Sequence, residues 1–289
     1  MAPSNAKSLT DVRNGALLQM AEAATLGLPF EVWKTRMGRF RGESNLVAFG
    51  RVYQDGGGGL SGVRAFWAGF TPKMVESATK GAVLMVAKEG LKDAAASVGM
   101  NPFLGAILAG AGGGVCQTVV MGPCTYLVTA AVTGGSSGGG AKTTSELVRI
   151  TYARAGLRGF YPGGSAIAVR QATNWASRQG ITEGLRIRLR SMRYEDKSAK
   201  LSPNEEISCG IMGGALSCWN HPIEVARIEM QARANAGQSS ISIMDVFRLV
   251  IREHGLPGLF KGVLPRVGLG IWQTLFMVSS VHIIGSSKK

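Results

Sequence analysis

Two long stretches of this sequence carry no charged residue. Residues 94–141 are 48 consecutive uncharged positions, and residues 267–287 add another 21. A helix crosses a lipid bilayer with about 20 apolar residues, so either stretch is long enough to span one. Charges such as Glu22, Lys80 and Arg170 interrupt the other apolar segments. These charges fit the helices of a soluble protein, or membrane helices whose charged side lines a watery cavity.

The apolar segments belong to a pattern that occurs three times. In each occurrence a Pro ends a segment rich in small residues, and a Gly beside an aromatic or basic cluster follows that Pro by 40 positions. The pairs of positions are Pro29 with Gly69, Pro123 with Gly163, and Pro222 with Gly262. The units are 94 and 99 residues apart, which indicates an internal repeat. We therefore expect one domain over residues 1–289, with repeats at 12–98, 99–197 and 198–289.

Each repeat is predicted to hold two long helices and one short one. The first long helix is kinked at the Pro, the short amphipathic helix lies at 45–55, 145–155 or 243–254, and the second long helix begins near the Gly. Small residues gather before the Pro, as in 112–114 and 213–215, and let helix backbones pack closely in lipid. The expected fold is an all-α membrane protein with six transmembrane helices.

Composition narrows the classes of protein and the kinds of partner. Charged residues are only 17% of the chain and hydrophobic residues 45%, which excludes a disordered tail protein. Four Cys residues are too few for a disulfide scaffold. Lys and Arg outnumber Asp and Glu by 32 to 18, and the net charge of +14 indicates an anionic partner. Acidic lipid, a small polyanion and nucleic acid all satisfy that requirement.

No pattern in the chain indicates catalysis or a metal site. Cys218 and His221 have the spacing of two zinc ligands, but no second pair follows them. No nucleophile with a base partner is present, so we expect neither an enzyme nor a cofactor. The basic run at 186–193 motivates a nucleic-acid-binding alternative, but it lacks interleaved aromatic residues. A solvated helix end near anionic lipid headgroups is the favoured interpretation of that run.

The motif Pro-x-Glu-x-x-Lys/Arg begins at Pro29 and again at Pro222, and an aromatic-rich box with a Gly follows 40 residues later. This sequence resembles the mitochondrial carrier family over nearly its whole length. Four stretches are most similar to the branch of that family that exchanges citrate for 2-oxoglutarate: VESATKGAVLMV, VRQATNWASR, WNHPIEVARIEMQ and PRVGLGIWQTLFMV.

The resemblance implies a pseudo-threefold barrel of six helices in the mitochondrial inner membrane, with three short helices on the matrix side. It also implies a central site reached alternately from each face, small polycarboxylate substrates, contact with membrane lipid, and a monomer. The expected activity is exchange of a tricarboxylate such as citrate for 2-oxoglutarate or a related dicarboxylate. A relative dedicated to isocitrate or cis-aconitate, and a degenerate carrier that binds without transporting, remain as alternatives.

The repeat locates a candidate site. If each second long helix starts near its Gly, residues 4, 7, 8 and 11 positions after that Gly lie close to one face. These positions, together with one family-implied lining position, give the candidate substrate residues Lys80, Arg170, Arg266, Glu76, Gln171, Asn174, Gln273 and Leu84. Three cations and one carboxylate converge at similar depth, so we expect an anionic ligand.

A simpler interpretation is that Glu76 and Lys80 only pair with each other along their helix, which is worth a few tenths of a kcal/mol. That pair leaves Arg170 and Arg266 without partners. An uncompensated cation inside a bilayer costs at least about 2.5 kcal/mol. A carboxylate ligand relieves that cost, since Arg can hold it through two parallel hydrogen bonds.

The resemblance also implies ion-pair gates at both ends of the barrel. At the matrix gate Glu224 is expected to pair with Lys34, while Glu31 and Arg227 face Val128 and Thr125 and lack their usual partners. The cytosolic gate is expected at Glu89, Lys92, Glu183 and Arg186, where only Glu89 with Arg186 makes a complete pair. These charges are alternatively helix-end residues solvated among lipid headgroups. Glu22 lies seven residues before the first Pro, and it either faces the cavity or binds a proton.

Overall fold

The structure is a computed structural model that describes residues 5–134, 143–193 and 201–286. The described residues form helices joined by short turns, without a β-strand. The first repeat holds α1 (Asn5–Glu22), the π-helical turn η1 (Ala23–Gly27), α2 (Leu28–Arg39), α3 (Asn45–Asp55), α4 (Gly59–Ala65) and α5 (Phe70–Ser97). The second holds α6 (Pro102–Cys116), α7 (Thr118–Gly134), α8 (Thr144–Ala155), the 3-10 turn η3 (Gly156–Phe160) and α9 (Gly164–Arg193). The third holds α10 (Pro203–Leu216), the 3-10 turn η4 (Ser217–Asn220), α11 (His221–Asn235), α12 (Ile243–His254), the 3-10 turn η5 (Leu256–Phe260) and α13 (Val263–Ser286).

The three short helices expected between the long ones are present as α3, α8 and α12, and α4 is an additional helix that the sequence pattern did not predict. Side chains fix where the short helices begin. Thr143 and Glu146 form a reciprocal capping box at the start of α8. At α12 the Ser242 hydroxyl donates to Asp245, and this hydrogen bond holds the pKa of the exposed Asp245 carboxyl below its usual range.

The first long helix of the first repeat breaks before Pro29, which has no N–H group to donate. In the π-helical turn the N–H of Leu28 bonds the carbonyl of Ala23, five residues back. Continued by one residue, this register would make Pro29 the donor to the carbonyl of Ala24, and proline has no N–H. The indole N–H of Trp67 donates to that carbonyl at 2.7 Å instead, which ties the kink to the turn before α5.

The other two kinks are satisfied in related ways. In the second repeat the carbonyl of Val119, four residues before Pro123, accepts a hydrogen bond of 2.9 Å from the hydroxyl of Tyr161. Tyr161 lies two residues before its repeat's Gly, the position that Trp67 occupies in the first repeat. In the third repeat the N–H of His221 bonds the carbonyl of Cys218 through a tight turn, so no aromatic donor is needed.

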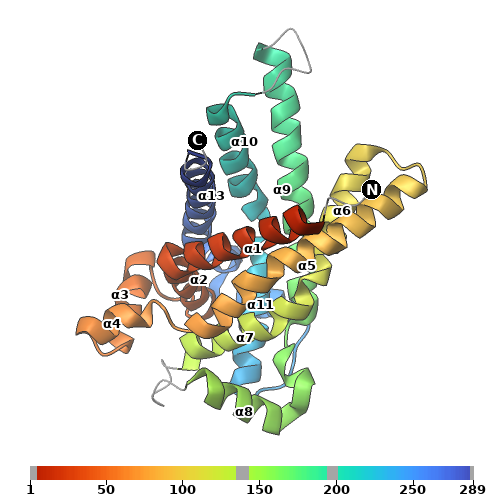
Figure 1. Cartoon of the computed structure of the whole chain (residues 1–289). Helices are drawn as coiled ribbons and strands as arrows, with labels where there is room; N and C mark the ends of the chain where they lie inside the picture. The colour runs from red at the N-terminus through yellow and green to blue at the C-terminus, as the bar shows by residue number, and fades with distance from the viewer. Residues whose placement is uncertain (1–4, 135–142, 194–200, 287–289) are drawn as a thin grey trace.

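The long elements follow one another around a closed circuit. In the described residues α5 packs on α1 and α6, α6 on α9, α9 on α10, α10 on α13, and α13 on α1 and α2. The segments after the three kinks, α2, α7 and α11, contact one another and form what we call the convergent end. Figure 1 shows α9, α10 and α13 projecting together away from this end, while α1, α5 and α6 diverge from them.

The three repeat glycines permit close packing at the convergent end. Gly69, Gly163 and Gly262 have φ values of 75°, 69° and 87°, which L side chains rarely adopt, and α5, α9 and α13 begin directly after them as predicted. Each lies against the kinked helix of the next repeat in the circuit. A Cβ at Gly69 would lie 2.9 Å from Cα of Val128, and one at Gly262 would lie 3.0 Å from the carbonyl oxygen of Lys34.

Within the described residues, no helix taken singly combines the length and apolar character needed to cross a membrane, but one bent pair does so jointly. This pair joins Leu104–Cys116 to Thr118–Gly134 through a bend of 51°.

Candidate functional site: a cationic cavity

A cavity of about 520 Å³ lies between the diverging helices and the convergent end. Every candidate substrate residue from the sequence lines it: Glu76, Lys80, Leu84, Arg170, Gln171, Asn174, Arg266 and Gln273. They come from α5, α9 and α13, each of which starts at its repeat glycine. Equal distance from that start therefore places them at similar depth.

The cavity also contains residues that the sequence analysis missed. Lys73 lies four residues after Gly69, which is the register that identified Arg266 after its own glycine, so the same rule could have found it. Arg178 lies one turn beyond Asn174 on α9. The first long helices of the repeats and the turns within them, to which the register rule was not applied, add Gln19, Gln117, Met121, Ser217 and Cys218. Glu22, which was expected to face the cavity or bind a proton, also lines it, as do Glu31 and Lys34 from the expected matrix gate.

The lining is strongly cationic. The positively charged side chains are Lys34, Lys73, Lys80, Arg170, Arg178 and Arg266, and the carboxylates are Glu22, Glu31 and Glu76. Six cations against three carboxylates give a formal charge of +3. Since low-dielectric walls focus the field of such a cluster, the cavity is suited to a ligand with more than one negative charge.

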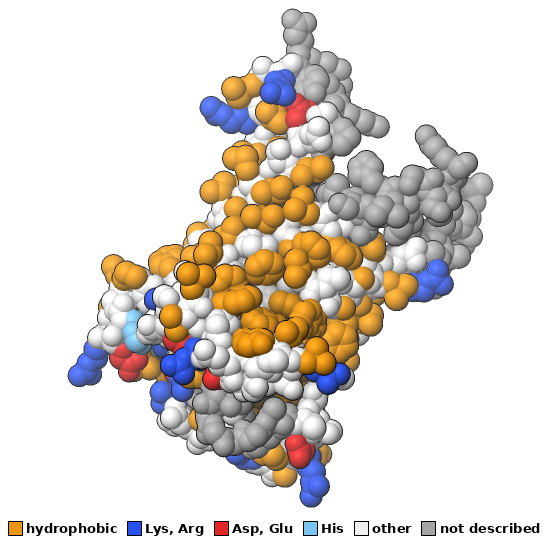
Figure 2. Space-filling view, turned by 90° about the vertical axis from the view of Figure 1, so that its left-hand side faces the viewer, with side chains coloured by type: hydrophobic (Ala, Val, Ile, Leu, Met, Phe, Trp, Pro, Cys, Tyr) orange, Lys and Arg blue, Asp and Glu red, His pale blue; other side chains and the backbone are white. Residues whose placement is uncertain are grey.

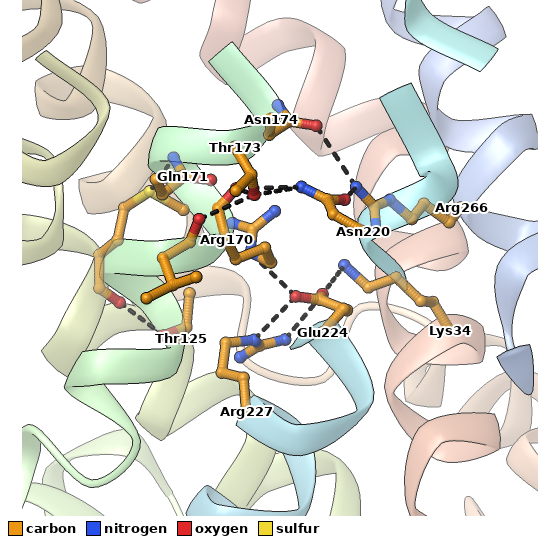
Figure 3. Close-up of polar contacts among 12 residues, drawn as sticks. Lys34, Thr125, Arg170, Gln171, Thr173, Asn174, Asn220, Glu224, Arg227 and Arg266 are labelled. Carbon is orange, nitrogen blue, oxygen red and sulfur yellow. Dashed lines mark hydrogen bonds and ion pairs between the residues drawn. The ribbon is translucent and has the colours of Figure 1, made fainter. Parts of the chain in front are cut away.

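The floor of the cavity is built around Glu224, which is buried in α11 (Figure 3). Its carboxylate lies 2.8 Å from Nζ of Lys34, 3.0 Å from Nε of Arg170 and 3.0 Å from Nη2 of Arg227. The contact between Lys34 and Glu224 is the one that the family resemblance led us to expect. The expectation that Arg170 lacks a protein partner is wrong, because Glu224 lies within ion-pair distance of it.

Two arginines of the cavity keep unused hydrogen-bonding capacity. Nε of Arg170 lies close to Glu224 but is not aligned for a hydrogen bond, and it has no partner among the described residues. Arg266 donates through Nη2 to the side-chain oxygens of Asn220 and, at 3.3 Å, Asn174. Its buried Nη1 has no hydrogen-bond partner among the residues that the structure describes. Neutral amides therefore orient Arg266 without neutralising it (Figure 3). An anion in the cavity would meet donors that are already desolvated and directed.

A chain of ion pairs with alternating charges, which we call the ladder, runs along one wall of the cavity away from Glu224. Glu31 lies 3.5 Å from Lys34 and 2.5 Å from Lys73, and Glu76 lies 3.3 Å from Lys73 and 3.6 Å from Lys80. Glu31 thus lacks the base that is usual at position 128, and Lys73 from α5 pairs with it instead. The simple ion pair of Glu76 with Lys80 along α5 is present at the far end of the ladder, but Glu76 also pairs with Lys73.

A second layer of ion pairs joins the first and third repeats beyond the floor. Glu229 on α11 lies 2.7 Å from Nη1 of Arg39 and 2.6 Å from Nη2 of Arg41, and the side chains of Glu229 and Arg41 are almost fully buried. Lys34 and Glu224 thus form the inner of two ion-pair layers between α2 and α11. The sequence analysis had expected a single complete pair at this end.

Between the second and third repeats, where Thr125 replaces an acid, neutral hydrogen bonds take the place of an ion pair. Gln231 on α11 donates to Thr125 at 3.1 Å, and its Oε1 accepts from Thr129 at 2.9 Å. Arg227 lacks the acid that is usual at position 125 and instead donates to the same oxygen at 2.6 Å. Gln231 is completely buried, so this network is shielded from water.

Between the first and second repeats the contact is apolar. Leu28 and Val32 of α2 pack with Val128 and Val132 of α7 in one buried cluster. Val128 stands where the family pattern led us to expect a base, and it also receives Gly69. The convergent end is therefore closed by ion pairs, hydrogen bonds and apolar packing at its three interfaces.

Gln117, at the break between α6 and α7, fixes part of the opposite wall. Its Oε1 accepts hydrogen bonds from Gln171 at 2.9 Å and from the indole of Trp175 at 3.0 Å. Its Nε2 donates to the backbone carbonyl of Lys80 at 2.8 Å. One side chain thereby holds α5, α6 and α9 together at the level of the candidate site.

The far end of the molecule does not contain the expected pair between Glu89 and Arg186. In the described residues Arg186 lies 2.5 Å from Glu206 and 3.3 Å from Glu183, whereas Glu89 and Lys92 are exposed. The reason is geometric, because α6 lies between α5 and α9 and the helices diverge at this end. The expected pairing of Glu89 with Arg186 is therefore absent from this conformation.

The family model for mitochondrial carrier proteins matches this chain three times, at residues 5–97, 99–193 and 199–284. The chain belongs to the mitochondrial carrier family. As a family member it is a transporter and not an enzyme, and the resemblance first drawn from the two Pro motifs is confirmed.

Among curated carriers, the Saccharomyces cerevisiae citrate/oxoglutarate carrier protein is 37% identical over 94% of this chain and 87% of its own length. The Dictyostelium discoideum mitochondrial substrate carrier family protein Z is 27% identical over 83% of this chain and 79% of its own length. The tricarboxylate transport protein of S. cerevisiae is 24% identical over 88% of this chain and 87% of its own length. None of these matches favours the nucleic-acid-binding alternative.

Proposed function

We propose that this carrier exchanges a tricarboxylate such as citrate for 2-oxoglutarate or a related dicarboxylate. The observation that carries the proposal is the cavity with a formal charge of +3, in which Arg170 and Arg266 keep buried N–H groups without hydrogen-bond partners. Two guanidinium groups and Lys80 match a ligand with two or three carboxylates, because Arg binds carboxylate in a bidentate manner. The 37% identity to a citrate/oxoglutarate carrier supports the same substrate class.

The location that we propose is the mitochondrial inner membrane, with the six long elements as spanning segments of a pseudo-threefold barrel. Family membership and the circuit of helix contacts support this arrangement. The outer surface supports it as well. Figure 2 shows hydrophobic side chains continuous over the middle of one face, with Lys and Arg toward its edges. Contiguous apolar surface of this kind marks sites of contact with membrane or protein.

Transport would proceed by alternating access between two states. In the state described here the convergent end is closed by the contacts around Glu224, Gln231 and Val128, and the cavity opens toward the diverging end. Substrate bound to Arg170 would compete with Glu224 for that guanidinium. The ligand would thereby loosen the floor, and differential binding of this kind is what shifts a conformational equilibrium.

The test is reconstitution of the purified protein into liposomes with a panel of internal and external carboxylates. The proposal predicts rapid exchange of citrate with 2-oxoglutarate and slow release from liposomes when no counter-substrate is outside. A preference for isocitrate or cis-aconitate over citrate would instead identify a relative specialised for another tricarboxylate. Binding of citrate without any exchange would identify a degenerate carrier and overturn the proposal.

A further inference from the structure

Glu22 is a buried carboxylate that the contacts described above do not use. It is the last residue of α1, its exposed fraction is only 4%, and it lines the cavity. Oε1 of this carboxyl group has no hydrogen-bond partner among the described residues. The π-helical turn that follows brings Gly27 against the same oxygen, and the bare Cα of glycine leaves room for it.

The other carboxylates of the cavity differ from Glu22 in their partners. Glu31 and Glu76 each lie within 4 Å of two lysines. In the described part of the chain no cation lies within that distance of Glu22. The charged groups facing it at longer range are Lys80 and Lys73 from α5 and Glu31 from α2, and its neutral polar neighbour is Gln273 from α13.

This environment permits both protonation states. A carboxylate shielded from water without a close cation is disfavoured in its charged form, whereas the lysines of α5 favour that form from a distance. Because shielding from water and the distant lysines act in opposite directions, a carboxyl group placed there can bind or release a proton when the charge inside the cavity changes. A polyanionic substrate bound to the cations of the cavity would be such a change, because Glu22 lines the same cavity.

We propose that Glu22 binds the proton that accompanies a trianionic substrate and is ionised when a dianion occupies the cavity. The inference rests on the proposed polycarboxylate exchange and specifies its charge balance. The proton joins a carboxylate oxygen of Glu22 in the compartment from which the trianion enters. It leaves that oxygen in the compartment to which the trianion is delivered, and no other bond is made or broken.

The charges on the cavity make this coupling self-consistent. With Glu22 ionised the lining carries +3, and with Glu22 protonated it carries one charge more. A trianion in the protonated cavity and a dianion in the ionised cavity then leave the same residual charge of about +1, on the formal count of lining groups. The two loaded states therefore cross the closed intermediate with equal electrostatic cost, and the exchange moves no net charge.

The test uses the full chain in liposomes that contain 2-oxoglutarate and a trapped pH dye, with citrate outside at a pH where it is fully ionised. The wild type is expected to import about one proton per citrate and to respond less than about twofold to a potassium diffusion potential. Glu22→Gln should import citrate without that proton and become driven by the potential. Glu22→Asp should retain proton import, and Glu253→Gln, an exposed acid on α12, is the matched control and should behave as wild type.

The possible failures are distinguishable. Absence of any polycarboxylate exchange by the wild type would overturn the proposed function itself. Exchange by the wild type that carries net charge and no proton would leave that function standing and overturn the role of Glu22. Unchanged proton import in Glu22→Gln would do the same, because the proton would then travel elsewhere. If Glu22→Gln does not accumulate in a folded form, a wild type that imports no proton, or a Glu22→Asp protein that has lost proton import, still overturns the role of Glu22.

Discussion

Nζ of Lys34 lies 2.8 Å from Oε1 of Glu224 across the boundary between the first and third repeats, and the two residues are not equivalent partners. Glu224 also contacts Arg170 and Arg227, so removing Lys34 leaves a carboxylate that still has cations beside it. Removing the carboxylate leaves three buried cations together. The loss of Glu224 should therefore be the more damaging change.

We predict that Lys34→Ala shifts the equilibrium toward opening of the convergent end by about 1–2 kcal/mol, or roughly 5- to 30-fold. Glu224→Gln should cost about 3–5 kcal/mol because it leaves uncompensated buried charge. Labelling of Cys124 by a thiol reagent from the convergent side, measured by peptide mass spectrometry, reports the opening, since Cys124 is 7% exposed.

The exchange Lys34→Glu with Glu224→Lys provides the matched control for that prediction. It should restore only part of the activity lost in Glu224→Lys, because the new acid would face Glu31 and the new base would face Arg170. The outer layer of Glu229 with Arg39 and Arg41 should keep each single variant folded. Equal labelling of Cys124 in the wild type, Lys34→Ala and Glu224→Gln would show that this pair does not hold the end closed.

Gln231 should matter to stability as much as an ion pair does. Gln231→Leu removes its hydrogen bonds to Thr125, Thr129 and Arg227 at a fully buried position. Each buried polar group left unpaired costs about 1–3 kcal/mol, so we expect a clear fall in the thermal unfolding temperature in detergent. Gln238→Leu, at an exposed position, is the control and should change stability by no more than about 0.5 kcal/mol. Equal unfolding temperatures for the two variants would refute the role of this network.

Gly262→Ala should destabilise the junction between the third and first repeats. The backbone at this position has a φ of 87°, and a Cβ would lie 3.0 Å from the carbonyl oxygen of Lys34. A left-handed conformation costs a non-glycine residue about 1–2 kcal/mol before any overlap is counted. Gly50→Ala, inside α3 with open space around it, should instead be neutral or stabilising by up to about 1 kcal/mol. Thermal unfolding of the two variants separates them, and a Gly262→Ala protein as stable as Gly50→Ala would contradict the packing described here.

Much of this architecture could be predicted from the sequence because the repeat supplies registers. The start of each second long helix and most lining residues on α5, α9 and α13 follow from counting forward from a Gly, and the three short helices follow from their amphipathic patterns. Lys73 was missed although it obeys the same count. The layer formed by Glu229 with Arg39 and Arg41 could not be predicted, because Arg41 lies in the turn after α2 and its position depends on tertiary packing. The predicted pair of Glu89 with Arg186 is absent from this conformation, because the helices diverge at that end and such a pair needs the end to be closed.

Arg266 is the residue whose loss should most directly weaken substrate binding, because no carboxylate pairs with it in the described chain and Asn220 and Asn174 hold it in place. Arg266→Ala should reduce exchange at least about 100-fold, since a bidentate carboxylate contact in a dry site is worth about 3 kcal/mol. Arg266→Lys should recover only part of that loss. Arg248→Ala, on the exposed face of α12, should exchange at the wild-type rate. Initial rates in liposomes measure the effect, and near wild-type exchange by Arg266→Ala would remove this arginine from the site.

The measurement that tests the central claim most directly is uptake of labelled citrate into liposomes holding one internal substrate at a time. The cavity charge of +3 predicts uptake at least about tenfold faster against internal 2-oxoglutarate than against the internal cation ornithine, a difference of about 1.4 kcal/mol or more. The proposed carboxylate substrate class predicts the same margin over internal ADP, which is also a polyanion. Equal rates with all three internal substrates, or uptake of labelled ADP as fast as that of citrate, would contradict the assignment of this carrier to polycarboxylates.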